Sequence, residues 1–216
     1  MAGDAAVIAD RLGVGSFATL GWSGGGPFAL AAAALAGERV TRVGVACGPA
    51  PFQEMPGAMD AFTESDRMAL EFLPEHPDRA AEQFRIGNDE MLQAMLSARD
   101  DEDAPWIDWM WGDTDPDVVS DPVMRRSLST VVREGLRQDA MGICWDNVAW
   151  GGPWGFGLDE VLPPVHLWYG GRDRMMPPAN GQWLNENLPD AALTVHPNDG
   201  HLLPMRHWQQ ILLKLI

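Results

Sequence analysis

The residues Gly21-Trp22-Ser23-Gly24-Gly25 fit the pattern G-x-S-x-G, which places a serine on a sharp turn between a strand and a helix. A short apolar run at residues 17–20 precedes the turn and predicts a buried strand. Pro27 follows the turn and opens an Ala-rich helix that is expected to end near Gly37. The motif requires a strand before the turn and a helix after it, so we predict that Ser23 is a nucleophile.

The neighbours of Ser23 are each expected to have a role in the turn. The Gly24 N–H and the N-terminus of the helix would point at a developing oxyanion. Side chains at Gly21 or Gly25 are expected to hold the strand away from the helix, which would explain glycine on both sides of Trp22 and Ser23. The alternative is a glycine-rich turn whose serine only caps the helix.

A carboxylate and a histidine each follow a later predicted strand. Asp173 comes after the strand at residues 165–169, and His201 comes after the strand at residues 193–196. The carboxyl ends of parallel strands lie at one edge of a sheet, where the sites of open α/β proteins are found. Taken singly, the two residues are typical of a turn and of a surface loop. Together with Ser23, their order predicts a nucleophile, an acid and a base.

Two rival motifs fail on their context. The pattern G-x-G-x-x-A at residues 13–18 precedes a strand and opens no helix, which disfavours a dinucleotide site. The acidic run at residues 113–117 resembles a calcium loop at three ligand positions, but Val118 and Met124 replace the required Gly and Glu. We therefore interpret this run as a solvated acidic loop. Since no spacing of histidine and cysteine indicates zinc either, neither a metal nor a cofactor is predicted.

The remaining side chains with reactive groups have structural explanations. His166 and His196 fall within predicted strands, and His207 falls within the last predicted helix. His76 lies in a stretch flanked by prolines. Cys144 lies in an apolar helical segment without a sharp turn, which favours a buried thiol over a nucleophile.

Two kinds of sequence alternate along the chain. Residues 1–51 and 163–216 contain helices that alternate with short apolar strands, which predicts a mostly parallel sheet with flanking helices, an α/β fold. Residues 52–162 contain several helix starts, such as Asp121-Pro122, separated by proline-rich and acidic breaks. Six of the ten tryptophans fall in this insertion: Trp106, Trp109, Trp111, Trp145, Trp150 and Trp154. We therefore predict a core in two segments, interrupted by a helical insertion.

The composition excludes several partners. The chain has 216 residues, with 31 acidic and 15 basic side chains and a formal net charge of -16. This charge repels nucleic acid and anionic lipid surfaces, so neither is an expected partner. The start of the chain lacks the features of a signal peptide, and no apolar run is long enough to cross a membrane. With only two cysteines, Cys47 and Cys144, we expect a soluble protein of the reducing cytoplasm.

Three segments resemble the α/β-hydrolase superfamily, in its actinobacterial branch: GWSGGGP at residues 21–27, GGRDRMMPP at 170–178 and GHLLP at 200–204. The likeness runs over essentially the whole chain. It implies roles for the residues of the motifs: Ser23 as nucleophile, Asp173 as triad acid, His201 as base, Gly24 as an oxyanion donor, and Gly21, Trp22 and Gly25 as parts of the nucleophile elbow. It also implies that residues 52–162 form a lid over the substrate pocket.

The front of the chain departs from this family. Relatives carry several strands before the elbow strand and a loop that donates a second oxyanion N–H, whereas only 22 residues precede Ser23 here. We therefore expect a truncated form of the fold, in which the strand at 17–20 becomes an open edge. Loss of one oxyanion donor typically lowers the rate by ~10²–10³. The open edge also makes self-association an option.

The expected reaction is hydrolysis of a carboxylic ester of a mainly apolar small molecule, through an acyl-Ser23 intermediate. An amide or lactone substrate, as in iminopeptidase-like relatives, is the enzymatic alternative. Haloalkane dehalogenases and many epoxide hydrolases of this fold carry an aspartate at the elbow, so the serine argues against both. A non-catalytic remnant of the fold, or a binding module, is the alternative from another class.

Overall fold

The structure is a computed structural model that describes residues 2–98, 101 and 103–216. These residues form two compact units, one made of residues up to 50 together with 154–216, the other of residues 51–153. The insertion predicted from the sequence ends at residue 162, whereas the second unit ends at residue 153, a difference of nine residues. The difference arises because Leu158 is buried in the first unit, where the short 3₁₀ helix η3 (Leu158–Glu160) packs on the helix α2 (Gly25–Ala36).

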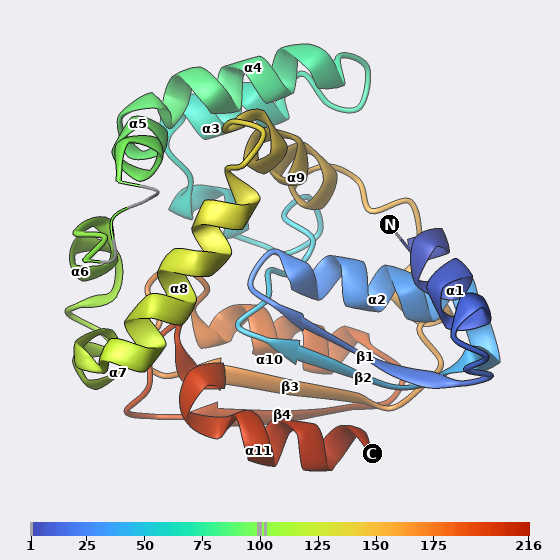
Figure 1. Cartoon of the computed structure of the whole chain (residues 1–216). Helices are drawn as coiled ribbons and strands as arrows, with labels where there is room; N and C mark the ends of the chain where they lie inside the picture. The colour runs from blue at the N-terminus through green and yellow to red at the C-terminus, as the bar shows by residue number, and fades with distance from the viewer. Residues whose placement is uncertain (1, 99–100, 102) are drawn as a thin grey trace. The chain divides into compact units, whose positions relative to one another are not determined.

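The first unit is built on a parallel sheet, which confirms the predicted α/β fold. Within the described residues it has four strands in the order β1-β2-β3-β4: β1 (Phe17–Trp22), β2 (Val40–Ala46), β3 (Val165–Gly170) and β4 (Ala191–His196). Its other helices are α1 (Ala2–Arg11), η1 (Gly37–Arg39), α10 (Pro178–Asn187) and α11 (Leu203–Leu215). Figure 1 shows α11 on the opposite side of the sheet from α2 and α10. Both faces of the sheet are therefore covered by helices, as a parallel sheet requires.

The order of the elements explains the parallel pairing. The helix α2 connects β1 to β2, and α10 connects β3 to β4, so each connection returns the chain to the same end of the sheet. On one face, α11 packs against the sheet through a buried cluster: Cys47, Trp168, Leu203, Ile211 and Leu215. The carboxyl ends of the strands consequently share one edge of the sheet.

The strand β1 lies at one end of the described sheet. It pairs with β2 and with no other described strand. Ala18 is exposed, and the flanking side chains of Phe17 and Thr19 are half-buried. The other strand at an end of the order is β4.

The second unit is helical in its described residues. It contains the helices η2 (Ala58–Ala61), α3 (Glu64–Leu70), α4 (Pro77–Gly87), α5 (Asp89–Ser97), α6 (Trp106–Trp111), α7 (Pro116–Ser120), α8 (Pro122–Gly135) and α9 (Met141–Gly151). The start of α8 is the one predicted from Asp121-Pro122: the Asp121 carboxylate accepts hydrogen bonds from the N–H groups of Val123 and Met124. The helix α4 packs against both α3 and α9.

Two side chains in the second unit test the interpretation of its motifs. Asp115 is fully buried and accepts a hydrogen bond from the Thr114 hydroxyl, so the prediction of a wholly solvated acidic loop is wrong at its centre. The reason is that Asp115 stands at the start of α7, whose Val118 and Val119 are buried. Cys144 is a buried thiol of α9, as predicted, and burial raises its pKa.

Candidate active site

Ser23 lies on the turn between β1, which ends at Trp22, and α2, which begins at Gly25. Its φ of 54° is in the left-handed region, which a residue other than glycine enters at a cost of ~1–3 kcal/mol. Two backbone hydrogen bonds hold this conformation: the Ser23 N–H donates to Ala46 O at 2.9 Å, and the Gly26 N–H donates to Ser23 O at 2.9 Å. The strained strand-to-helix turn is the geometry that the G-x-S-x-G pattern predicts.

The glycines of the turn differ in what they do. A Cβ on Gly21 would lie 2.1 Å from the Gly25 carbonyl oxygen, so the strand and helix touch there through backbone atoms. A Cβ on Gly25 would meet nothing within 4 Å, so the prediction that a side chain at Gly25 blocks the turn is wrong. The crowded helix position is Gly26, where a Cβ would lie 3.0 Å from Val45 Cγ1 and 3.2 Å from Gly48 Cα.

Gly24 has the position expected of an oxyanion donor. It is the residue before the first turn of α2, with φ −55° and ψ −12°, and therefore belongs to the positive end of the helix dipole. Within the described part of the chain, its N–H donates to no backbone carbonyl.

Asp173 and His201 form a buried hydrogen-bonded pair. His201 Nδ1 lies 2.8 Å from Asp173 Oδ2, and the two side chains are 3% and 0% exposed. The other carboxylate oxygen, Asp173 Oδ1, accepts hydrogen bonds from the N–H groups of Met175 and Met176, both at 2.9 Å. In the tautomer that donates Nδ1–H to this carboxylate, Nε2 of the imidazole is a proton acceptor. The residues predicted as acid and base therefore lie within hydrogen-bond distance of each other.

The loops that carry this pair are packed against each other by glycines. A Cβ on Gly170 would lie 2.4 Å from the carbonyl oxygens of Asp199 and Gly200, and one on Gly171 would lie 2.7 Å from Pro197 O. The Arg172 N–H donates to Asp199 O at 2.9 Å. The two loops after β3 and β4 therefore cross with backbone against backbone, which places Asp173 beside His201.

Trp22 connects the elbow with the loop of the base. Its indole Nε1 donates to His201 O at 2.9 Å, and the centres of the two rings are 5.5 Å apart. Within the described residues, no hydrogen bond joins the Ser23 hydroxyl to the His201 ring. Such a bond is often long or absent in an unliganded enzyme and tightens when substrate binds.

Cys47 is a neighbour of the site to which the sequence analysis gave no role. It follows β2, has a φ of 49°, and donates its N–H to Trp168 O at 2.8 Å. Its Sγ lies within 4.8 Å of the ligand atoms of both Asp173 and His201. The sequence signal is its position at the end of a mostly apolar run, residues 42–47, which predicts a buried strand. The same kind of position, after a predicted strand, identified Asp173 and His201.

Other buried polar groups support the same edge of the sheet. The Tyr169 hydroxyl donates to Gly48 O at 2.5 Å, and burial raises the pKa of this phenol well above its usual value. The Asn180 side-chain oxygen accepts a hydrogen bond from the Ala50 N–H at 3.0 Å. These bonds fix the chain after β2, which borders Cys47.

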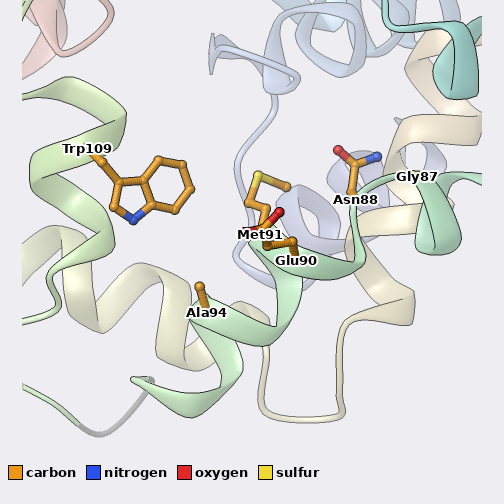
Figure 2. Close-up of a pocket in the computed structure, with 6 residues that line it drawn as sticks. All are labelled: Gly87, Asn88, Glu90, Met91, Ala94 and Trp109. Atoms are coloured by element: carbon orange, nitrogen blue, oxygen red, sulfur yellow. The ribbon is translucent and has the colours of Figure 1, made fainter.

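A pocket of about 480 Å³ lies within the second unit and contains none of the predicted site residues. It is lined by residues of α4, α5, α6 and the α4–α5 junction: Gly87, Asn88, Glu90, Met91, Ala94 and Trp109. The Trp109 side chain extends from α6 into the space beside Met91 (Figure 2). The pocket therefore belongs to the helical unit alone.

Comparison with solved structures shows the fold. The chain matches a hydrolase from Pseudomonas aeruginosa PA01 with a TM-score of 0.62 and 18% identity, over 99% of this chain and 69% of that one. It matches a bromoperoxidase from Bacillus anthracis with a TM-score of 0.62 and 18% identity, over 99% and 72%. An esterase from Exiguobacterium antarcticum matches with a TM-score of 0.58 and 18% identity, over 100% and 70%.

A curated relative matches a shorter part of the chain. The pimeloyl-[acyl-carrier protein] methyl ester esterase of Aromatoleum aromaticum is 41% identical over 54 residues, which are 25% of this chain and 22% of that protein. The chain thus matches less than a quarter of the length of this relative. No helix in the described residues is long and apolar enough to cross a membrane. Residues 1–207 match the family model described as alpha/beta hydrolase fold, and on this match, which spans nearly the whole chain, the protein belongs to the alpha/beta hydrolase fold family.

Proposed function

We propose that the chain is a serine hydrolase that cleaves a carboxylic ester through an acyl-Ser23 intermediate. The observation that carries the proposal is the buried Asp173–His201 pair, 2.8 Å apart, in the same unit as a serine held at a left-handed φ. A structural histidine would not need a carboxylate whose second oxygen is fixed by two backbone N–H groups. A helix-capping serine would not need a strained backbone.

In the proposed reaction, His201 Nε2 takes the Ser23 proton as Oγ attacks the ester carbonyl carbon. The Gly24 N–H stabilises the oxyanion of the tetrahedral intermediate. The C–O bond to the alcohol then breaks, and the alcohol leaves with the proton from His201. A water molecule, deprotonated by His201, next attacks the acyl carbon. The bond from this carbon to Ser23 Oγ then breaks, His201 returns the proton to Oγ, and the carboxylic acid is released. Asp173 holds the imidazole and stabilises its protonated form throughout.

An ester is favoured over an amide or a lactone by the curated relative, whose name describes a methyl ester esterase. In this proposal the helical unit, residues 51–153, acts as the lid that the family resemblance implies. Its tryptophan and methionine side chains suit a mainly apolar substrate. Hydrolysis rates for a set of p-nitrophenyl esters and the matching p-nitroanilides separate ester from amide chemistry. Faster hydrolysis of the anilides would show that the substrate is an amide and not an ester.

A fluorophosphonate probe tests the nucleophile directly. The probe is expected to add one phosphonyl group to Ser23 in the whole chain, as located by peptide mass spectrometry. Ser23→Ala should abolish the labelling, while Ser127→Ala, at an exposed serine of α8, should leave it unchanged. Circular dichroism checks that both variants fold. Absence of labelling in the folded wild-type chain would overturn the proposal and favour a non-catalytic member of the fold.

A further inference from the structure

Three side chains outside the proposed triad converge on one point of the first unit. His196 is the last residue of β4, Asp199 lies in the loop that follows, and His207 lies in α11. His207 Nε2 is 2.6 Å from Asp199 Oδ2, and His196 Nδ1 is 3.7 Å from the same oxygen. One ligand atom from each residue lies within 4.8 Å of the other two.

Two imidazoles and one carboxylate are a ligand set for a divalent transition metal such as zinc. Metal bonds to such ligands are about 2.0–2.2 Å long, which places the ligand atoms around a tetrahedral ion about 3.3 Å apart. The distances of 2.6 and 3.7 Å to Asp199 Oδ2 lie on either side of that value. The centres of the two imidazole rings are 3.9 Å apart, and one nitrogen of each ring lies within 4.8 Å of the other and of the Asp199 oxygen, so the rings must move apart to bind one ion.

The surroundings keep the cluster in a form that can bind a cation. Asp199 Oδ1 is held by Arg206 at 3.1 Å, which orients the carboxylate and leaves Oδ2 directed at the two rings. The positive charge of Arg206 opposes the cation and weakens its binding.

The cluster is also accessible to an ion. The side chains of His196, Asp199 and His207 are 23%, 14% and 21% exposed, so an ion reaches them from solvent and a water molecule can complete its coordination. The net charge of -16 raises the concentration of cations near the surface. By contrast, the trio Cys47, Asp173 and His201 is buried, so an ion does not reach it directly from solvent.

We propose that His196, Asp199 and His207 bind a divalent transition-metal cation of the zinc type. Bound there, the ion connects β4, the loop of His201 and α11, three parts of the first unit. The site is separate from the proposed ester chemistry and does not depend on it. Its expected effect is to stabilise the folded chain, because the ion binds the folded form only.

Zinc binding to the whole chain tests the site. Isothermal titration with ZnCl₂ is expected to show one equivalent bound, and the thermal midpoint should rise with zinc concentration. His196→Asn and His207→Asn should each weaken binding by at least about 10-fold, in line with loss of one metal ligand. The matched control His76→Asn removes an exposed histidine of the second unit and should leave binding unchanged. Equal affinity in all four proteins would overturn the proposal.

Cobalt substitution reports which side chains bind the ion, and the spectrum of the wild-type chain alone shows whether a thiolate is among them. Co²⁺ bound by two imidazoles and a carboxylate is expected to show weak visible bands without the intense near-ultraviolet band of a cobalt–thiolate bond. A thiolate band in the wild-type chain, lost in Cys47→Ser, would move the ion to the buried trio and overturn the assignment. An unchanged Co²⁺ spectrum in His207→Asn would overturn it as well.

Discussion

Ser23 is held in a backbone conformation that its own side chain disfavours, with a φ of 54°. Glycine adopts this region freely, whereas alanine and serine do not. We therefore expect Ser23→Gly to be more stable than Ser23→Ala by about 1 kcal/mol. Urea unfolding monitored by circular dichroism measures the unfolding free energy of each variant. The matched pair Ser127→Gly and Ser127→Ala, in the helix α8, should show the opposite order by up to about 1 kcal/mol. If the glycine and alanine variants have the same order of stability at Ser23 and at Ser127, the strain at Ser23 is contradicted.

Asp173 fixes the tautomer of His201, because its Oδ2 faces Nδ1 while its Oδ1 accepts two backbone N–H groups. In Asp173→Asn the amide oxygen keeps the backbone bonds, so the amide NH₂ faces Nδ1 and moves the imidazole hydrogen to Nε2. We expect kcat for a p-nitrophenyl ester to fall by about 10³–10⁴-fold with little loss of stability. Asp159→Asn, at an exposed aspartate of η3, is the control. Comparable rates in the two variants would exclude Asp173 from the reaction.

His166 in β3 should make the stability depend on pH. Burial, followed by the charges of Lys214 and Arg42, lowers its pKa, while Asp190 acts in the opposite direction. The folded state therefore favours the neutral ring, and its contribution is present above the unfolded pKa of about 6.5 and lost as pH falls through the lower folded value. The unfolding free energy of wild type should fall more between pH 7.5 and 5.5 than that of His166→Asn. If the unfolding free energies of wild type and His166→Asn change equally with pH, the prediction is contradicted. The control His76→Asn should keep the pH dependence of wild type.

At the scale of elements, the contact between β1 and α2 depends on Gly21. A Cβ there would lie 2.1 Å from a backbone oxygen that cannot move without shifting the helix, whereas a Cβ on Gly25 meets open space. We expect Gly21→Ala to destabilise the chain by at least about 2 kcal/mol and to abolish fluorophosphonate labelling. Gly25→Ala, four residues away in the same motif, should change the unfolding free energy by less than about 1 kcal/mol. Equal losses of unfolding free energy in Gly21→Ala and Gly25→Ala would show that the close approach of β1 and α2 does not determine the stability.

The elements show which parts of the fold can be read from local sequence. Apolar runs between helical stretches predicted the strands at residues 17–20, 165–169 and 193–196, because burial of a parallel sheet requires apolar side chains on each strand. The order of Ser23, Asp173 and His201 after three of those strands predicted which residues would share an edge. The helix α2 begins at Gly25, two residues before the Pro27 that signalled it, since proline suits any position in a first turn.

What the sequence missed depends on contacts between segments far apart in the chain. The crowding that explains Gly26 involves Val45 and Gly48, and the Trp22 indole bonds to the loop of His201. Neither contact leaves a local pattern. The burial of Asp115 was missed for a related reason: an acidic run predicts solvent exposure on average, and one member turned inward at a helix start.

At the scale of the whole molecule, the open side of β1 and the net charge of -16 have opposing effects on self-association. A second copy can pair its own β1 with this strand, because the side of β1 away from β2 has no described strand on it. The like charge of two copies opposes that pairing, and salt screens the repulsion. We therefore expect sedimentation velocity to show a larger dimer fraction as NaCl is raised from about 0.02 to 0.5 M, where screening is nearly complete.

A lysine on the edge distinguishes strand pairing from a general effect of charge. Ala18 is an exposed residue of β1, and Ala18→Lys should suppress the dimer at high salt, as lysine does on natural edge strands. Val131→Lys, at a position of α8 that is 60% exposed, makes the same change in net charge away from the edge and should leave the dimer intact. If charge alone governs association, both variants will dimerise more readily than wild type, because each reduces the negative charge by one. A chain that is monomeric at every salt concentration would instead show that the edge of β1 does not pair with a second copy.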